Sequence, residues 1–451
     1  MSDIQAPQQN ANVTLQREGL TSFLLAVTTV LILMNTAMFN LAVPDITHYF
    51  HLTPSTASLT ITGYSIMFAI SSITYSRLSD FVPIHLLFAI SLTSIGLASI
   101  IGFFSNHFWL LLVARIFQAS GAGAGISLSI ILLSRYVPLN RRGKSMSLIM
   151  ASVSLGIGLG PILGGLIVQY WGWKYLFAVS MLLLLIVPFL YILIPKESFT
   201  KGSFDVKGAL YISMGTAGLL LFLTNPSWWI CIGIGIVGLI LFALHITRTP
   251  DPFIEASLFK NKTYLTLSFI GIMAYMCNFA TLYLLPQMLM NHFKLNASEA
   301  GLVVFPGALL AMFVSRKAGN FIDANGNKSI LNYVPLLPLV ATLLFALLGV
   351  HFWFANIIGY IVLSLGFTIL GSSVMNEITR LLPSSQITSG TGLYQLLQFF
   401  SGAFVIAAVS NVMIWQNHLP PALSYANIFW GMFFLALLGI AFSYFYRKRS
   451  A

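Results

Sequence analysis

Ser154 to Gly165 read SLGIGLGPILGG, and this stretch decides the fold. It lies inside a long apolar segment, although in a water-soluble helix glycine costs about 1 kcal/mol and proline about 3 kcal/mol relative to alanine. Gly156, Gly160 and Gly164 recur every four residues, so they share a helix face that another helix backbone can approach closely. Pro161 removes a backbone donor and is expected to kink the helix. The stretch predicts a membrane helix that packs tightly on a neighbour, either as a generic packing face or as a family signature.

The composition is that of a protein that crosses a membrane many times. Of the 451 residues, 57% are hydrophobic and only 7% are charged, and the mean hydropathy is +0.88. A soluble domain has about 25% charged residues. Residues 1–19 are polar and lead into a full-length span, so no cleavable signal peptide is expected. Cys231 and Cys277 both fall in apolar segments, which argues against a disulfide framework or a cysteine metal site.

Fourteen segments are apolar enough to cross a bilayer, which takes about 20 residues. They are residues 20–43, 56–76, 84–104, 108–133, 145–169, 174–194, 206–224, 227–247, 265–289, 298–315, 329–350, 353–378, 388–414 and 426–446. The seventh and eighth are the weakest, because only Asn225 and Pro226 separate them. With the N-terminus inside, nineteen of the 22 Lys and Arg residues fall in cytoplasmic segments, as the positive-inside rule predicts. Both termini are then cytoplasmic, and the net charge of +11 indicates contact with anionic lipid rather than with nucleic acid.

A weak internal repeat suggests how the spans are grouped. Ser76 precedes Asp80 by four residues in the loop after the second span, and Gly319 precedes Asp323 by four after the tenth, in a loop that also contains Gly326. If spans 1–6 and 9–14 are equivalent halves, spans 7 and 8 are an inserted pair. The predicted division is a cytoplasmic tail at 1–19, an N-terminal six-helix half at 20–195, the inserted pair with an interfacial linker at 196–264, a C-terminal six-helix half at 265–446 and a basic tail at 447–451.

Several further stretches share a pattern with one known family. They read NLAVPDI at Asn40–Ile46, RIFQASG at Arg115–Gly121, WGWKYLF at Trp171–Phe177, LLPQ at Leu284–Gln287 and AGLVVFP at Ala300–Pro306. With Gly156, Gly160, Pro161, Gly164 and Gly165, they resemble the fourteen-span drug:proton antiporters of the major facilitator superfamily. The resemblance covers nearly the whole chain. It implies an all-α membrane fold with two six-helix halves, an inserted helix pair and a substrate cavity between the halves near the midplane.

Arg115 is the most informative single residue. It lies eight residues into the fourth predicted span, where an Arg costs at least about 2.5–3.5 kcal/mol on insertion scales. It must therefore face the bundle interior and be paired or hydrated. In the family, the matching Arg is associated with proton transfer and with substrate; the alternative is a structural Arg bonded to carbonyls of neighbouring helices. Gln118, three residues further on, could share its network.

Proton coupling requires a carboxylate that changes protonation as the cavity switches sides. The acid that multidrug relatives carry in the first span is replaced by Asn35, and the one that tetracycline exporters carry in the thirteenth falls near Ser401. Asp45, at the outer end of the first span, and Glu377, near the inner end of the twelfth, are nearest to the bilayer. The alternatives are a solvated helix-end carboxylate for Asp45 and an exposed ion pair with Arg380 for Glu377.

Asp80 matches the acid that latches the cytoplasmic gate in the family. The basic residues that follow it there are missing here, which puts the latch in doubt unless Arg135, Arg141 or Arg142 replaces them; otherwise Asp80 is a solvated loop residue. The candidates for lining the cavity are uncharged: Asn35, Tyr64, Gln118, Asn278, Gln287, Tyr394 and Gln398. Such groups bind substrate or, more commonly, join helices.

The leading function is proton-coupled efflux of amphipathic drugs, dyes or quaternary ammonium compounds from the plasma membrane of a bacterium. A more specific tetracycline antiporter is the nearer alternative, and the scarcity of membrane acids favours an uncoupled facilitator. An enzyme, a sensor or a nucleotide-driven pump is disfavoured, because the sequence has no nucleophile–base pair, metal-ligand spacing or phosphate loop. The expected partners are small-molecule drugs, protons and membrane lipid, without cofactor, metal or nucleic acid; the oligomeric state is not predicted.

Overall fold

The computed structural model describes residue 15 and residues 17–52, 54–200, 202–225 and 227–450, so most of the predicted tail at 1–19 lies outside the described residues. Every element in that part of the chain is helical. The elements are α1 Glu18–Tyr49, α2 Pro54–Leu78, α3 Ile84–Phe103, α4 Phe108–Tyr136, α5 Leu139–Trp171, η1 Trp173–Tyr175, α6 Leu176–Met181, α7 Leu183–Leu193, α8 Val206–Thr224, α9 Trp229–Ile246, α10 Ala256–Lys260, α11 Lys262–Asn291, α12 Ala297–Asn325, α13 Lys328–Tyr333, α14 Leu336–Leu344, η2 Phe345–Gly349, α15 Ala355–Leu381, η3 Ser384–Gln386, α16 Ile387–Trp415 and α17 Pro421–Ser450.

Fourteen helical segments among the described residues are long and apolar enough to span a membrane, which confirms the predicted number. Helices are expected here, because the bilayer core contains no water and the backbone polar groups of a span must form hydrogen bonds with one another. The sixth span is divided into η1, α6 and α7, and the eleventh into α13, α14 and η2. Pro335 separates α13 from α14 because proline has no N–H to donate to the preceding turn. At the other end of the chain, α17 runs to Ser450, so residues 447–450 of the predicted basic tail continue the last helix.

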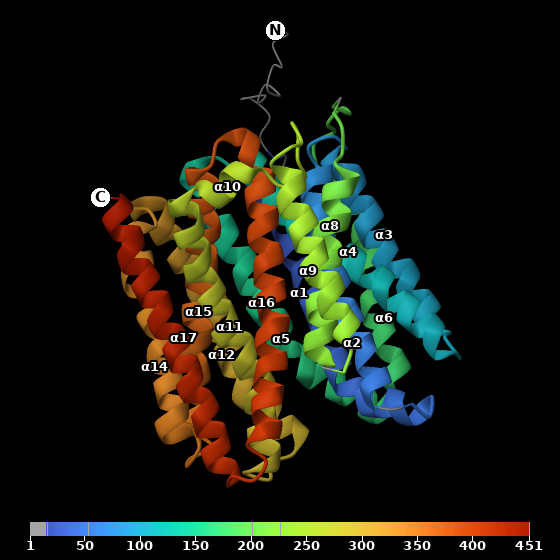
Figure 1. The fold of residues 1–451 in the computed structure, drawn as a ribbon, viewed down its shortest axis with the longest axis vertical. Helices are drawn as coiled ribbons and strands as arrows, with labels where there is room; N and C mark the ends of the chain where they lie inside the picture. Colours follow the sequence, from blue (N-terminus) through green and yellow to red (C-terminus); the bar gives the residue numbers. More distant parts are fainter. Residues whose placement is uncertain (1–14, 16, 53, 201, 226, 451) are drawn as a thin grey trace.

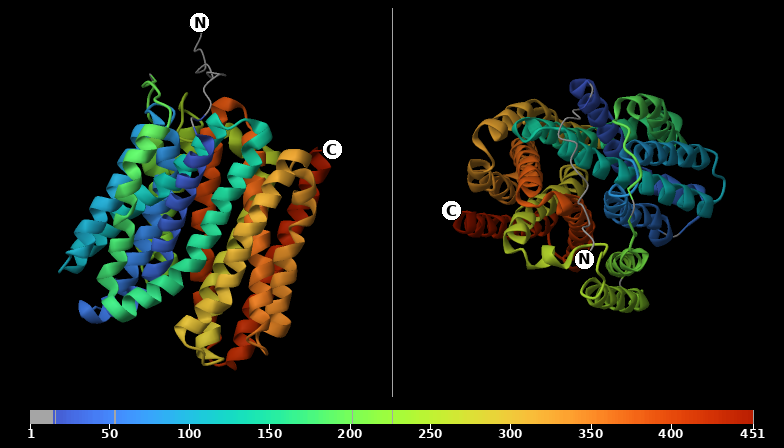
Figure 2. Two further views of the ribbon diagram at one scale, coloured as in Figure 1. Left: turned by 180° about the vertical axis from the view of Figure 1, so that it is seen from behind. Right: turned by 90° about the horizontal axis from the view of Figure 1, so that it is seen from above.

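The helices form two groups, α1–α7 and α11–α17, with α8 and α9 on the outside (Figures 1 and 2). The groups meet mainly where α5 packs on α12 and α15 and where α2 packs on α16, and α8 contacts both α2 and α16. Glycines allow α8 and α9 to pack closely: a Cβ built at Gly218 would lie 2.5 Å from the Cys231 carbonyl oxygen. The two weakest predicted spans are therefore a tightly packed helix pair.

One end of the bundle carries a group of arginine side chains. There α2, α4 and α15 end and α3, α5 and α16 begin, and the side chains of Arg77, Arg135, Arg142 and Arg380 lie close to these helix ends. The C-terminus of α17 and α10 lie at the same end (Figure 1). We call it the basic end.

Candidate transport site

The glycines of the opening stretch bring α5 against α1. A Cβ built at Gly156 would lie 2.7 Å from the Val30 carbonyl oxygen, and one at Gly160 would lie 2.5 Å from the Ala37 Cβ. At Gly164 the nearest atom would be the Met38 Cα, at 3.0 Å. Real Cβ atoms essentially never approach other atoms below 3.0 Å, so this face requires glycine. Pro161 and Gly165 are half-buried on the same helix, which continues through the proline.

Another glycine of this helix, Gly158, faces the second helix group. A Cβ built at Gly158 would lie 2.4 Å from the Ala308 Cβ on α12, in the other helix group. Gly158 is two residues from both Gly156 and Gly160, which turns it to a different side of the helix. The four-residue spacing of Gly156, Gly160 and Gly164 does not include Gly158, so this contact was not predicted. One stretch of α5 thus packs on α1 within one group and on α12 across the boundary.

Arg115 lies in α4 with only 1% of its surface exposed. Its guanidinium carbon lies 3.8 Å from the ring centre of Phe39 and 4.1 Å from that of Tyr64. Nη1 donates to Gln118 Oε1 at 2.8 Å, and Gln118 Nε2 donates to Ser99 Oγ at 2.7 Å. Cation–π contacts of about 0.5–2 kcal/mol each offset much of the cost of placing Arg in a membrane. The predicted Gln118 contact is present, and no carbonyl bond to Arg115 occurs among the described residues.

Asn35 and Tyr64 belong to the same group of side chains. Thr36 donates its hydroxyl hydrogen to the Tyr64 oxygen at 3.1 Å, and Asn35 is a further hydrogen-bond partner of that hydroxyl. Both Asn35 and Tyr64 are 1% exposed. Three of the predicted cavity residues, Asn35, Tyr64 and Gln118, therefore lie around Arg115.

A row of aromatic rings runs from this group across the boundary to the second helix group. Tyr64 lies 6.0 Å from Phe68 between ring centres, and Phe68 of α2 lies 4.3 Å from Phe399 of α16. Phe399 lies 5.9 Å from Tyr275, which stacks on Phe279 at 4.2 Å. We call Tyr64, Phe68, Phe399, Tyr275 and Phe279 the aromatic row.

The remaining predicted cavity residues divide into two sets. Gln398 donates to the Tyr394 hydroxyl at 2.9 Å, and Tyr394 in turn contacts Gly271 of α11, the helix that carries Tyr275. Asn278 is 2% exposed and lies one helical turn from Tyr275. Gln287 is half-buried and donates to the Tyr283 carbonyl at 3.0 Å, so this hydrogen bond stays within α11.

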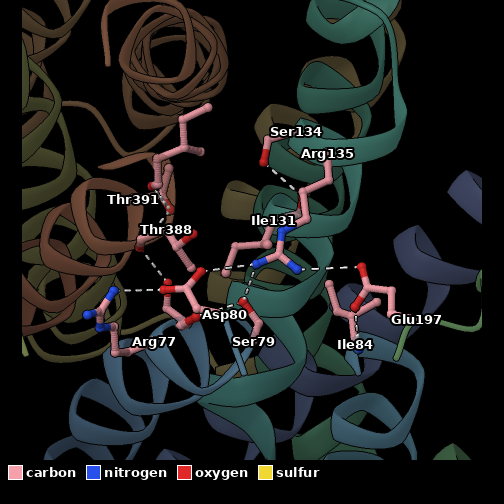
Figure 3. Close-up of polar contacts among 12 residues, drawn as sticks. Arg77, Ser79, Asp80, Ile84, Ile131, Ser134, Arg135, Glu197, Thr388 and Thr391 are labelled. Atoms are coloured by element: carbon pink, nitrogen blue, oxygen red, sulfur yellow. Dashed lines mark hydrogen bonds and ion pairs between the residues drawn. The ribbon is translucent and has the colours of Figure 1, made fainter. Parts of the chain in front are cut away.

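Asp80 contacts two arginines, although the basic residues that follow this acid in the family are missing here (Figure 3). Arg77 Nη1 donates to its carboxylate at 2.9 Å, and Arg135 Nη2 donates to it at 3.2 Å. The Thr388 hydroxyl of α16 is a third partner. Arg135 is one of the three arginines that the sequence analysis considered as replacement partners, and these contacts differ from those of the alternative, a solvated loop carboxylate. Burial raises the pKa of Asp80 above its ordinary value, and the charges of Arg135 and Arg77 and the bond from Thr388 oppose this.

Glu197 extends this network and was not predicted. Its carboxylate accepts from the Tyr136 hydroxyl at 2.5 Å and from the Ile84 amide at 2.9 Å, and it lies 3.5 Å from Arg135 Nη1 (Figure 3). Of the other basic residues considered for Asp80, Arg141 pairs instead with Glu18 at 3.2 Å. Arg142 donates to the Ser134 carbonyl at 2.5 Å.

The two loops of the internal repeat make similar contacts with opposite helix groups. Ser76, four residues before Asp80, donates to the Thr388 carbonyl in the first turn of α16 at 2.7 Å. Asp323 accepts from the backbone amides of Gly143 at 2.7 Å and Lys144 at 3.0 Å, near the start of α5. A Cβ at Gly319 would lie 2.6 Å from the Lys144 Cα. Gly326 follows α12 with φ +74°, a backbone region that favours glycine.

Asp45 and Glu377 occupy different surroundings. Asp45 is exposed and lines an open groove of about 300 Å³ with His48, Tyr49 and Trp173. Glu377 accepts from Asn327 Nδ2 at 2.6 Å and from the Tyr446 hydroxyl at 2.7 Å. Among the described residues, no ion pair joins Glu377 to Arg380.

The segment between α9 and α11 connects the inserted pair to the basic end. Arg77 donates to Asp251, and Gln386 donates to Glu255 at 2.7 Å just before α16. Asp205, the N-cap of α8, accepts from the Gly208 and Phe253 amides at 2.9 Å and bonds His245 Nε2 at 2.8 Å. Burial alone would raise the pKa of Asp205, but these three bonds outweigh it and hold the pKa below its ordinary value.

Comparison with known proteins identifies the class. The family model described as Major Facilitator Superfamily matches residues 25–407, and the chain belongs to this family. Its fold and family are those of membrane transporters. The human organic anion transporter MFSD10 (TETRAN) superposes on 93% of this chain and on all of its own chain with a TM-score of 0.69 at 15% identity, which shows the fold alone.

Bacterial relatives are moderately similar. The riboflavin transporter RibZ of Clostridioides difficile (strain 630) is 29% identical over 301 residues, which are 65% of this chain and 66% of that protein. The lincomycin resistance protein LmrB of Bacillus subtilis (strain 168) is 25% identical over 395 residues, which are 84% and 82% of the two chains. Membership of the superfamily is thus shown, and the relatives' names cover different substrates.

Proposed function

We propose that this protein exports amphipathic aromatic compounds across the bacterial plasma membrane by alternating access, in exchange for protons. The observation that carries the proposal is the pair of loop contacts at the basic end. Asp80 and Ser76 hold the start of α16, and Asp323 holds the start of α5. Because each contact consists of a few polar bonds across the boundary, the basic end can separate without disrupting the apolar packing inside either helix group.

The moving bodies in this proposal are the halves at 20–195 and 265–446. The inserted pair and linker at 196–264 follow the motion through Asp251 and Glu255. The basic end is assigned to the cytoplasm, with both termini there, since most Lys and Arg residues lie at this end. Asp80 is the proposed site of proton coupling, because its environment changes when the loop leaves α16.

A specific observation favours a second function, the uncoupled facilitator. All carboxylates among the described residues lie at or near helix ends or in the connecting segments: Glu18, Asp45, Asp80, Glu197, Asp205, Asp251, Glu255, Glu299, Asp323 and Glu377. None of them lies beside Arg115 or the aromatic row. A transporter without a carboxylate at its centre can work without a proton gradient.

The test is efflux from a host that lacks its own drug pumps. Ethidium, tetracycline, fluorescein and riboflavin, which all contain aromatic rings and differ in charge, would be measured side by side, with and without a protonophore; riboflavin is chosen from a relative's name. Export that stops when the gradient collapses supports the antiporter. Export that continues selects the facilitator, and the absence of export of all four compounds contradicts the proposed function.

A further inference from the structure

The centre of the molecule carries a positive charge without a matching negative one. Arg115 is surrounded by the rings of Phe39 and Tyr64 and by Gln118, and its Nε has no hydrogen-bond partner among the described residues. The described carboxylates all lie at or near helix ends or in connecting segments. An isolated cation in a low-dielectric interior attracts an anion strongly, because no solvent screens it.

Other buried polar atoms near the aromatic row are also unsatisfied. Within the described part of the chain, Asn35 Oδ1, Tyr275 Oη, Asn278 Oδ1 and Gln395 Nε2 have no hydrogen-bond partner. Each of these residues is at most 4% exposed. Native proteins pair nearly all of their buried polar groups, so a cluster of unpaired ones needs an explanation.

The unpaired atoms come from both helix groups. Arg115 and Asn35 belong to α4 and α1, whereas Tyr275 and Asn278 belong to α11 and Gln395 belongs to α16. Gln395 already accepts from Ser72 at 2.7 Å across the boundary, one turn from Phe68 and Phe399. Donors and acceptors thus lie on both sides of a row of aromatic rings, as a site for a flat compound with polar edges requires.

We propose that this centre binds planar aromatic compounds that carry an anionic group, with the anion at Arg115 and the rings along the aromatic row. Phe68 and Phe399 lie 4.3 Å apart in this structure, so binding requires these two rings to separate. A lipophilic cation would meet the charge of Arg115 with no carboxylate to balance it. This inference rests on the proposed function, because the separation of the two rings requires the proposed motion of the two helix groups. It narrows the proposed substrates to anions.

Two xanthene dyes test the charge directly, because fluorescein is an anion and rhodamine 123 a cation on nearly the same frame. Binding would be measured by fluorescence anisotropy with the full chain in nanodiscs of phosphatidylcholine, which carry no net charge. We expect fluorescein to bind about ten- to hundredfold more tightly than rhodamine 123, since hydrogen bonds to a charged group contribute on this scale. Equal binding, a preference for rhodamine 123 or no binding of either dye overturns the inference.

Three variants test whether Arg115 causes the preference for fluorescein. Arg115→Gln should abolish the preference for fluorescein, whereas Arg115→Lys should retain part of it because it retains the charge. Arg316→Gln removes a positive charge from an exposed position on α12 and should leave the preference unchanged. If Arg115→Gln does not fold, the affinities of the natural chain for the two dyes still test whether the site prefers an anion.

Transport in inside-out vesicles separates this inference from the proposed function. Binding of fluorescein without its transport supports the anion site and contradicts export. Transport of rhodamine 123 in preference to fluorescein supports export and overturns the anion site.

Discussion

Substituting Gly160 by alanine tests whether the contact between α5 and α1 supports the transport site. The new Cβ would lie 2.5 Å from the Ala37 Cβ, 3.0 Å from the Met34 carbonyl oxygen and 3.3 Å from the Met38 amide nitrogen. Carbon atoms pack at about 3.5–4.0 Å, so the helices must move apart by roughly 1 Å. Two of the three neighbouring atoms belong to the backbone, so rotating a side chain cannot relieve the overlap.

Overpacking is expected to lower the free energy of unfolding by about 1–3 kcal/mol. The higher helix propensity of alanine recovers up to about 1 kcal/mol of this loss. The displacement also reaches the site, because Ala37 lies between Thr36, which bonds Tyr64, and Phe39, which lies under Arg115. Gly160→Ala should therefore lower both thermal stability and transport.

The assay is the apparent melting temperature of the purified protein, with efflux measured in parallel. For a chain of this size, the net cost corresponds to a decrease of a few degrees. Gly431→Ala is the matched control, because a Cβ at Gly431 of α17 would have no atom within 4 Å. If Gly160→Ala melts at the same temperature as Gly431→Ala, the close contact between α5 and α1 does not limit stability, and the reasoning fails.

Three further predictions concern the basic end. At neutral pH, Asp80→Asn should decrease maleimide labelling of a cysteine introduced at Ser389, in a cysteine-free background, because the closed basic end favours the neutral form of this side chain. With the natural Asp80, burial raises the pKa of this carboxyl, so the closed basic end binds its proton more tightly than an open one; labelling, divided at each pH by that of the same cysteine in denatured protein because maleimide reacts with the thiolate, should be lowest below the ordinary pKa of about 3.9 and increase as the pH rises through the raised value. Asp323→Ala should weaken the start of α5 by about 1–3 kcal/mol and reduce transport, since two backbone amides lose a charged acceptor; unchanged efflux would contradict this. Because the pKa of Asp205 is lowered, its hydrogen bonds should stabilise the linker above about pH 4 and lose this effect as the pH falls through the lowered value. Limited proteolysis of residues 249–264 between pH 3 and 7 measures the stability of the linker, and Asp205→Asn should remove its dependence on pH.

The sequence predicts the helices well because the bilayer imposes a simple rule. A span must be apolar for about 20 residues, and this rule finds even α8 and α9, which only two residues separate in the prediction. The spacing of Gly156, Gly160 and Gly164 likewise predicts a common packing face, since the helical period is fixed. It does not predict that Gly158 meets Ala308, because that contact depends on where a helix 150 residues further on is placed.

The polar network at the basic end shows where the sequence analysis is incomplete. The residues considered as basic partners of Asp80 were those directly after it, where the family has them, and Arg135, Arg141 and Arg142; Arg135 does contact Asp80, but Arg77, three residues before it, was not considered. Asp251 and Glu197 could not be predicted, because side chains more than a hundred residues away in the chain meet Arg77 and the start of α3 only after folding. Ion pairs across such distances leave no periodic signal.

The central site and the basic end differ in the charges that they contain. The centre has a buried cation and unpaired polar atoms, whereas every described carboxylate lies at or near a helix end or in a connecting segment, and Asp80 and Asp323 bridge the two helix groups. An anionic substrate at Arg115 would supply the missing negative charge, so the loaded and empty centres differ in net charge without any protonation step there. Under the proposed function, proton coupling would act on the closure of the basic end rather than on the substrate itself. Asp80→Asn should then alter the dependence of transport on the proton gradient while leaving the affinity for fluorescein unchanged, and a change in that affinity would show that the two regions are not separate.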